Sequence, residues 1–366
     1  MTKITTNQYI LIAVFCILTS KLMTMPTVIF GFAGKDAVFS VILNTIIDVC
    51  IVLCITLLVR KYPNTTFFDL LKQKIKRVGA IIITSFVAIF LLFKGVFLLQ
   101  ETISFFSLAL YENINFWLLF VPALLCVMYI SYKGLSAIGR SIDIYWIFVF
   151  LALVILFVIS MTQVDFSANL PYFENGVWPF LNGSMHSMFY VGNGIVLLFF
   201  VGRVEQKPKL MRYTSLFAIG IGIFVIVNNL IFYCLFKNFV PYCTFAISHL
   251  SQYNPFVTDL GHVGWLTIIE STINLVFMTS IYYYAVRQYI QYTFVVKNRF
   301  VSSLIVGALY CVVTYTFGFD LYKMLDFVKN YAYYYSLALI PFVIILCIVL
   351  YKTRNQPPNK EVLCKN

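Results

Sequence analysis

Long apolar runs alternate with short polar segments along nearly the whole chain. Because a helix needs about 20 residues to cross the hydrocarbon core of a bilayer, each run predicts one membrane-spanning helix. The pattern predicts ten spans, at residues 8–30, 37–59, 80–107, 116–132, 143–162, 186–202, 213–236, 263–284, 300–318 and 332–351. We therefore expect an all-α integral membrane protein in which residues 1–351 form a single polytopic membrane domain.

The amino-acid composition supports this prediction. Of the 366 residues, 61% are hydrophobic and 11% are charged, and the mean hydropathy is +0.90. Ordinary soluble domains carry roughly 25% charged residues, so a water-soluble protein is excluded. The first apolar run follows only Lys3, lacks a small-residue cleavage site and is too long for the apolar part of a signal peptide. It is therefore expected to remain in the protein as a span.

The basic residues are distributed unevenly between the two sides of the predicted topology. One side carries 20 of the 26 Lys and Arg residues: Lys3, Arg60, Lys61, Lys72, Lys74, Lys76, Arg77, Lys133, Arg140, Arg203, Lys207, Lys209, Arg212, Arg287, Lys297, Arg299, Lys352, Arg354, Lys360 and Lys365. The other side carries only Lys35, Lys237, Lys323 and Lys329. Since cytoplasmic loops are enriched in Lys and Arg, both termini are predicted to be cytoplasmic, including a short basic tail at residues 352–366. This topology accounts for the formal charge of +12 without a nucleic-acid partner.

Two predicted spans contain Gly, Pro and polar residues at membrane depth. In the first span they are Lys21, Thr24, Met25 and Pro26, followed by Gly31 and Gly34. In the sixth they are Gly183, Gly192, Asn193 and Gly194, preceded by Pro179 and Asn182. Such residues interrupt a helix in the membrane only where protein or a water-filled cavity satisfies the freed backbone groups. The first and sixth helices are therefore predicted to be broken.

Spans one and six occupy corresponding positions when ten helices are divided into two halves of five. Paired discontinuous helices are typical of inverted-repeat transporters, which bind substrate or ions at the half-helix ends near the bilayer midplane. The two predicted repeats cover residues about 8–162 and about 186–351. The alternative is that Pro26 only kinks its helix and that the glycines only allow close helix packing.

Five ionisable residues lie inside predicted spans: Lys21, Asp48, Lys94, Glu101 and Glu270. Charges at membrane depth are costly and are therefore candidates for function. Lys94 and Glu101 are seven residues apart, on one face of the third span but two turns from each other. At least one of them is expected to meet another helix, with Glu270 as a candidate partner. Two roles remain open for these three residues: ion pairs that fix helix packing, or gating linked to protonation of a poorly solvated carboxyl group.

The sequence contains no motif of a nucleotide-binding or hydrolytic enzyme. There is no GxxxxGK[ST], GxSxG or HExxH. The nine cysteines include no CxxC pair, and the three histidines share no ligand spacing. Neither a metal site nor a disulfide framework is predicted. We therefore expect a protein that is not an enzyme and that has no cofactor.

A set of short motifs extends in a specific order over nearly the whole chain. They are Pro26 with Gly34-Lys35-Asp36-Ala37, Arg60-Lys61-Tyr62-Pro63-Asn64 with Phe67-Phe68, Lys133-Gly134 with Arg140, Glu174-Asn175-Gly176-Val177-Trp178-Pro179 with Gly183-Ser184, and Trp265 with Glu270. Together they resemble the B-subunit of GerA-type endospore germinant receptors. These proteins are also called spore germination permeases and belong to the amino acid/polyamine/organocation transporter superfamily.

The resemblance implies a ten-helix LeuT-like fold with a 5+5 inverted repeat and a location in the inner membrane of the spore. It also implies a complex with an A-subunit and a lipoprotein C-subunit. The implied function is to sense a small nutrient, such as an amino acid, a sugar or a nucleoside, and so to trigger germination. Two other functions stay open: an autonomous proton-coupled amino-acid transporter, and an ion or water conduit that opens during germination.

Helix breaks and resemblance together predict a ligand site between the first and sixth helices. The expected lining residues are Thr24, Met25, Pro26, Tyr190, Gly192, Asn193 and Gly194. The chain departs from the family at this site. The family commonly has a Gly-Glu pair in the broken sixth helix, whereas this chain has Gly192-Asn193. The carboxylate that could bind a cation or an amino group at that position is therefore missing.

Overall fold

The computed structural model describes residues 3–110, 115–162, 164–205, 207–252 and 263–352. Within these ranges the regular structure is helical, apart from one isolated β-bridge between Ile4 and Val204. The basic tail predicted at residues 352–366 lies outside the described residues from position 353 onward.

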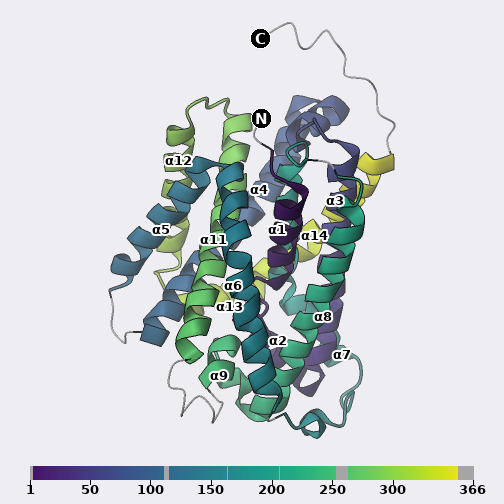
Figure 1. The fold of residues 1–366 in the computed structure, drawn as a ribbon, viewed down its shortest axis with the longest axis vertical. Helices are drawn as coiled ribbons and strands as arrows, with labels where there is room; N and C mark the ends of the chain where they lie inside the picture. Colours follow the sequence, from purple (N-terminus) through teal and green to yellow (C-terminus); the bar gives the residue numbers. More distant parts are fainter. Residues whose placement is uncertain (1–2, 111–114, 163, 206, 253–262, 353–366) are drawn as a thin grey trace, which may run out of the picture.

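The α-helices form one elongated bundle (Figure 1). In chain order they are α1 (Thr6–Leu18), α2 (Met25–Ala33), α3 (Ala37–Lys61), α4 (Phe67–Leu110), α5 (Phe116–Lys133), α6 (Leu135–Met161), α7 (Trp178–His186), α8 (Leu210–Phe236), α9 (Ala246–Gln252), α11 (Val263–Thr293), α12 (Arg299–Thr316), α13 (Leu321–Phe327) and α14 (Tyr333–Lys352). Short 3₁₀ segments are η1 (Gly34–Asp36), η2 (Phe166–Asn169), η3 (Met188–Tyr190), η4 (Asn193–Phe200) and η5 (Lys237–Tyr242), and a π-helical turn, η6, covers Val328–Ala332.

The all-α membrane class predicted from the sequence is confirmed. Seven helical segments of the described chain are long and apolar enough to cross a membrane, or eight if α7 and the following 3₁₀ segments count as one bent span. The first predicted span is divided, because α1 has 13 residues and α2 has 9. The number of ten crossings therefore stays a prediction.

Three helices begin well before the predicted spans, and one of them is α4, which begins at Phe67 instead of residue 80. The sixth span was expected from residue 186, but α7 begins at Trp178, with Pro179 in its first turn. Proline suits that position because its missing N–H would have no helical partner there. The fifth span was expected from residue 143, but α6 begins at Leu135, directly after Gly134 ends α5 with a φ of 91°. In α6 and α7 the added residues mix apolar with small and polar side chains.

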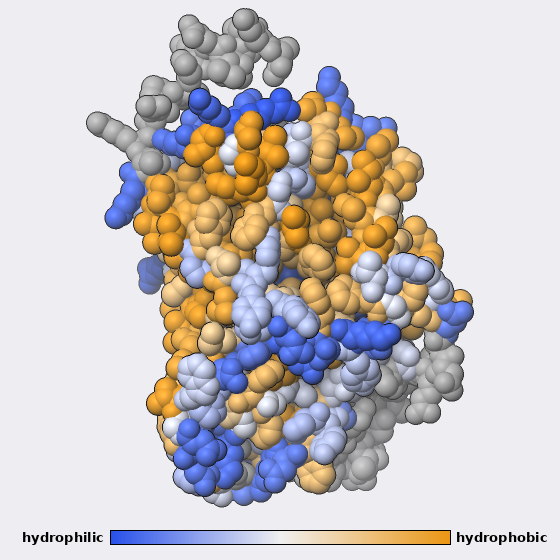
Figure 2. All heavy atoms as spheres, turned by 180° about the vertical axis from the view of Figure 1, so that it is seen from behind, coloured by the Kyte–Doolittle hydropathy of each residue, from blue (hydrophilic) through white to orange (hydrophobic). Residues whose placement is uncertain are grey.

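α1, the first half of the broken first helix, lies inside the bundle. Other helices form the outer surface of the bundle. α1 contacts α6 and α8, and most of its side chains are buried. α4 and α11 form the most extensive helix pair. By contrast, α5, α6 and α12 expose large apolar side chains such as Leu118, Ile144 and Val312. Figure 2 shows a wide hydrophobic zone on the back of the molecule, with hydrophilic residues at its upper rim and towards the bottom. This surface fits a bundle whose sides face lipid.

The N-terminal segment is bound to the residues that follow η4. The Ile4 N–H donates to the Arg203 carbonyl (2.9 Å), and the Glu205 N–H donates to the Ile4 carbonyl (2.8 Å). The Thr6 hydroxyl adds a third hydrogen bond, to the Glu205 carbonyl (2.7 Å). The outer ends of α1 and η4 are therefore joined to each other.

A cysteine introduced by Asn64→Cys is expected to be protected from a membrane-impermeant thiol reagent outside intact cells. Asn64 is exposed, and its Oδ1 accepts a hydrogen bond from Lys3 Nζ at 2.9 Å, so this loop and the N-terminus lie at the same end of the bundle. Glu174→Cys is the matched control, because Glu174 lies 3.5 Å from Lys35 at the opposite end of α3. In a variant without the native cysteines, labelling of Asn64→Cys but not of Glu174→Cys would contradict the predicted orientation.

Candidate functional site

The first helix is broken between α1 and α2, as predicted. α1 ends at Leu18, and the Thr19 hydroxyl bonds back to the last turn of α1 at 2.6 Å. Ser20 then adopts a φ of 62°, which takes the chain out of helical geometry. α2 starts at Met25 with Pro26 in its first turn. The backbone between residues 19 and 24 therefore has polar groups that no regular helix satisfies.

The sixth helix is broken as well. α7 ends at His186, and its axis makes an angle of 51° with the following segment, Met188–Phe200. Gly192 has a φ of 81°, a left-handed conformation that glycine adopts without the penalty of a Cβ atom. The two breaks, predicted from Gly and Pro positions alone, therefore occur in corresponding helices.

The Glu101 side chain of α4 accepts hydrogen bonds at the start of α2. It is fully buried. Glu101 Oε1 accepts hydrogen bonds from the Thr24 N–H (3.3 Å) and the Thr24 hydroxyl (2.6 Å), and Oε2 accepts from the Ser20 hydroxyl (3.2 Å). The Tyr190 hydroxyl lies 3.2 Å from Thr24 Oγ1 and so connects this group to the sixth helix. A carboxyl group of the chain itself thus lies at the half-helix N-terminus, where backbone N–H groups favour negative charge.

Lys94 lies two turns before Glu101 on α4. Its side chain binds polar groups at the break of the sixth helix. Its ammonium donates to the Val191 carbonyl at 2.9 Å and to Asn193 Oδ1 at 2.5 Å. It also lies 5.0 Å and 5.3 Å from the ring centroids of Phe90 and Phe189. The carbonyl that the break releases is therefore bound by an internal cation.

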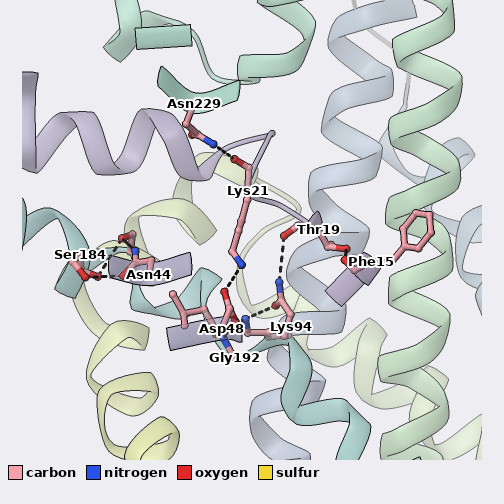
Figure 3. Close-up of polar contacts among 12 residues, drawn as sticks. Phe15, Thr19, Lys21, Asn44, Asp48, Lys94, Ser184, Gly192 and Asn229 are labelled. Atoms are coloured by element: carbon pink, nitrogen blue, oxygen red, sulfur yellow. Dashed lines mark hydrogen bonds and ion pairs between the residues drawn. The ribbon is translucent and has the colours of Figure 1, made fainter. Parts of the chain in front are cut away.

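Lys21 and Asp48 form a buried ion pair next to this contact (Figure 3). Their side chains are 0% and 1% exposed. Asp48 Oδ1 also accepts a hydrogen bond from the Gly192 N–H at 2.7 Å, so one carboxylate connects both breaks. Two asparagines bind carbonyls of the first break: Asn193 Nδ2 donates to Thr19 O, and Asn229 Nδ2 donates to Lys21 O, each at 3.2 Å.

The structure brings together most of the predicted ligand residues. Thr24, Tyr190, Gly192 and Asn193 contribute to the contacts at the breaks, and Met25 and Pro26 begin α2. Gly194 is placed differently, because a Cβ atom there would lie 2.8 Å from Val52 Cγ2 of α3. Its immediate role is close packing of η4 against α3. That these residues bind a ligand stays a prediction.

Lys94 and Glu101 each meet another helix, as expected, but the candidate partner Glu270 is bonded to neither of them among the described residues. Within the described residues, Lys94 bonds to the break of the sixth helix instead, and Glu101 bonds to the first. Glu270 is buried and accepts a hydrogen bond from the neighbouring Ser271 hydroxyl at 3.1 Å. The partners found instead include backbone groups freed by the breaks, and a sequence does not reveal where these groups lie.

Sequence reasoning missed two features of the site. Lys21 and Asp48 were recognised as buried charges but not as a pair, because they come from different helices. The polar contact between Asn44, Ser184 and Ser187 was also missed; it joins α3 to the end of α7 with distances of 2.6 and 2.8 Å. A signal did exist, since Asn44 and Asp48 are four residues apart and therefore share one face of the second span.

The arrangement is suited to binding and conformational change. Two ammonium groups and two carboxyl groups lie around the breaks, each with a partner inside the protein. Within the part of the chain that the structure describes, no group of three or more His, Cys, Asp and Glu could hold a metal ion.

Comparison with known sequences identifies relatives along most of the chain. A family model described as "Spore germination protein" matches residues 3–318. Spore germination protein A2 of Bacillus subtilis (strain 168) is 28% identical over 236 residues, which are 61% of this chain and 62% of the relative. Spore germination protein XB of Bacillus anthracis is 24% identical over 183 residues, 49% of this chain and 50% of the relative. The chain thus matches less than two thirds of the length of either relative.

Comparison with solved structures identifies the fold. The structure of MhsT in complex with L-phenylalanine matches with a TM-score of 0.66 and 14% identity, over 94% of this chain and 98% of that one. A manganese transporter of Eremococcus coleocola, solved with an aromatic bis-isothiourea substituted compound, matches with a TM-score of 0.61 and 11% identity, over 98% and 82%. The predicted LeuT-like fold with broken first and sixth helices is therefore confirmed.

Proposed function

Because the chain belongs to the spore germination protein family, we propose that it is the membrane-embedded B-subunit of a spore nutrient germinant receptor. In this proposal it lies in the inner membrane of the spore with both termini in the cytoplasm. Its partners are a receptor A-subunit and a lipoprotein C-subunit. It senses a small nutrient, such as an amino acid, a sugar or a nucleoside, and the bound nutrient triggers germination.

One observation carries this proposal: side chains of α3 and α4 form hydrogen bonds with the backbone polar groups of both breaks. In transporters with discontinuous helices, the half-helix ends and unwound carbonyls hold the substrate and the coupling ions. Here Glu101 binds the start of α2, Lys94 binds the Val191 carbonyl, and Asp48 binds the Gly192 N–H. The site is therefore satisfied internally before any solute binds.

An internally satisfied site gives a mechanism for sensing. A nutrient that binds at the breaks must replace some of these hydrogen bonds, and the released side chains then repack. A ligand shifts a conformational equilibrium only by its difference in affinity for the two states. The nutrient therefore has to bind the rearranged state more tightly, and partner subunits respond to that state.

The buried carboxyl groups of Glu101 and Glu270 favour a second candidate function. A carboxyl group in a poorly solvated site can bind and release a proton during transport. Under this alternative the chain is an autonomous proton-coupled amino-acid transporter. An ion or water conduit is the third alternative.

A vesicle experiment separates the three functions. The purified chain is reconstituted into vesicles, and amino acids, sugars and nucleosides are screened as labelled solutes. Saturable binding without accumulation supports the sensor, sustained accumulation supports the transporter, and a flux that only dissipates gradients supports the conduit. Binding of none of these solutes, by the chain alone or together with its partner subunits, would contradict the sensor.

Asn193→Ala is expected to strengthen nutrient binding at least tenfold, because a nutrient then no longer has to replace the internal hydrogen bonds of Asn193. The substitution removes the acceptor of Lys94 and the donor to the Thr19 carbonyl. A hydrogen bond to a charged group contributes about 1.5–3 kcal/mol, and about 1.4 kcal/mol corresponds to a factor of ten. Binding constants of the two proteins for the solute found in the screen give the measurement. Asn64→Ala is the control, because Asn64 is exposed and far from the breaks in the sequence. Equal affinity of Asn193→Ala and wild type would count against the site.

A further inference from the structure

Two buried arginines lie close to one tyrosine ring at the end of the bundle that carries the N-terminus. Arg203 follows η4 and is 9% exposed; Arg287 belongs to α11 and is 1% exposed. Their guanidinium carbons are 5.9 Å and 5.3 Å from the ring centroid of Tyr284. Two like charges are thus held close together in the protein interior.

Neither arginine has an acidic partner in the described chain. Arg203 donates to the hydroxyls of Tyr284 and Tyr292 and to Gln288 Oε1, but its Nε has no hydrogen-bond partner there. The Arg287 side chain makes no hydrogen bond to the described residues. Its buried Nε and Nη1 are both without a partner there. No ion pair within the described ranges includes either residue.

Burying an unpaired guanidinium costs desolvation free energy and is therefore rare in proteins. Arginine stays protonated in proteins, so it cannot avoid the cost of burial by losing its proton. Buried charges are therefore normally paired with an opposite charge. The ring of Tyr284 attracts the cations but does not neutralise them. The missing component is an anion.

An open surface pocket beside Arg203 offers room for such an anion. It has a volume of about 270 Å³ and lies where α11 ends and α12 begins. Its lining residues are Gln288, Gln291, Tyr292, Val295, Val296, Lys297 and Arg299. Gln288 and Tyr292 are the same side chains that accept hydrogen bonds from Arg203, so the pocket and Arg203 share a wall. Lys297 and Arg299 add two further positive charges, and no acidic residue lines the pocket.

We propose that this cluster, formed by Arg203, Arg287, Lys297 and Arg299, is a binding site for a phosphate group. A phosphate oxygen set accepts several charge-assisted hydrogen bonds at once and suits the fork of a guanidinium. The phosphate belongs either to the headgroup of an anionic lipid or to a soluble phosphate compound. The site is separate from the proposed nutrient site, and the proposal does not depend on that function.

Thermal unfolding of the purified full-length chain tests the proposal. Protein in phosphate-free detergent buffer is mixed with inorganic phosphate, with phosphatidylglycerol, with diacylglycerol, or with chloride at equal ionic strength. At saturation we expect a Tm rise of about 2–5 °C with at least one phosphate-bearing additive and none with the other two. A rise with phosphatidylglycerol alone identifies a lipid headgroup, and a rise with inorganic phosphate identifies a soluble ligand. No rise with either would overturn the proposal.

Arg287→Met distinguishes a ligand-binding arginine from a structural one. Removing an unpaired buried charge should leave the Tm without additive unchanged or higher, and the rise caused by the phosphate-bearing additive should disappear. Arg140→Met is the matched control, because Arg140 is exposed on α6; it should keep the full rise. An Arg287→Met protein with a lower Tm and an intact rise would overturn the proposal. If this variant does not fold, phosphorus retained by the wild-type protein after extensive delipidation is measured directly, and its absence has the same meaning.

Discussion

Asp48→Ala is expected to lower the free energy of unfolding by about 3–5 kcal/mol, the usual cost of removing one member of a buried ion pair. Lys21 and Asp48 are 0% and 1% exposed, so the remaining ammonium would have no access to water. The substitution also leaves the Gly192 N–H without its acceptor. Denaturant unfolding of the protein in detergent, followed by tryptophan fluorescence, gives the measurement.

The control for Asp48→Ala is a pair on the surface. Lys35 and Glu174 lie 3.5 Å apart with side chains 48% and 61% exposed, so Glu174→Ala should cost no more than about 1 kcal/mol. Replacing both members of the buried pair, as Lys21→Met with Asp48→Leu, should recover much of the loss, because no uncompensated charge remains. Equal stability of Asp48→Ala and wild type would contradict the buried pair.

Under the proposed receptor function, Lys94→Met is expected to lower the nutrient concentration for half-maximal germination more than tenfold, because the state without nutrient loses hydrogen bonds that a nutrient has to replace. The ammonium makes two charge-assisted hydrogen bonds, to the Val191 carbonyl and to Asn193. Each contributes about 1.5–3 kcal/mol, and about 1.4 kcal/mol is a factor of ten. Dose–response curves of spores, normalised to the amount of receptor, give the measurement.

Suppressor variants separate this contact from a carboxylate pair. Glu101→Gln and Glu270→Gln should not return the half-maximal concentration of Lys94→Met to the wild-type value, because neither glutamate is bonded to Lys94 among the described residues. Lys133→Met is the matched control, since Lys133 is exposed and lies over the ring of Tyr129. Rescue by either glutamine would support the ion pair that the sequence left open. A normal response of Lys94→Met would remove Lys94 from the mechanism.

The sequence predicted the features of the fold that depend on neighbouring residues. Apolar runs identified most helices, and Pro26 and Gly192 marked the two breaks, because these residue types act on their own backbone. Helix starts were less accurate. α6 and α7 extend past their apolar runs into segments of mixed polarity, where hydropathy does not distinguish a helix from a loop.

The candidate site was predicted as a list of residues but not as a set of contacts. Lys21, Asp48, Lys94 and Glu101 were all recognised by their charge at membrane depth, yet their partners come from other helices or from unwound backbone. Asn193 illustrates the difficulty, because its two ends bind Lys94 of α4 and the carbonyl of Thr19. Such partners depend on the relative rotation of helices, which one sequence does not specify.

The junction between the N-terminus and the end of η4 connects the two broken helices at one end of the bundle. Ile4 exchanges backbone hydrogen bonds with Arg203 and Glu205. At this end of the bundle, α1 and η4 therefore cannot separate without losing both bonds. These two half-helices and the first residues of the chain are therefore linked as one unit. A tag fused to the N-terminus would lie directly beside this junction and could disturb its hydrogen bonds. A C-terminal tag is therefore the better choice for measuring the native response.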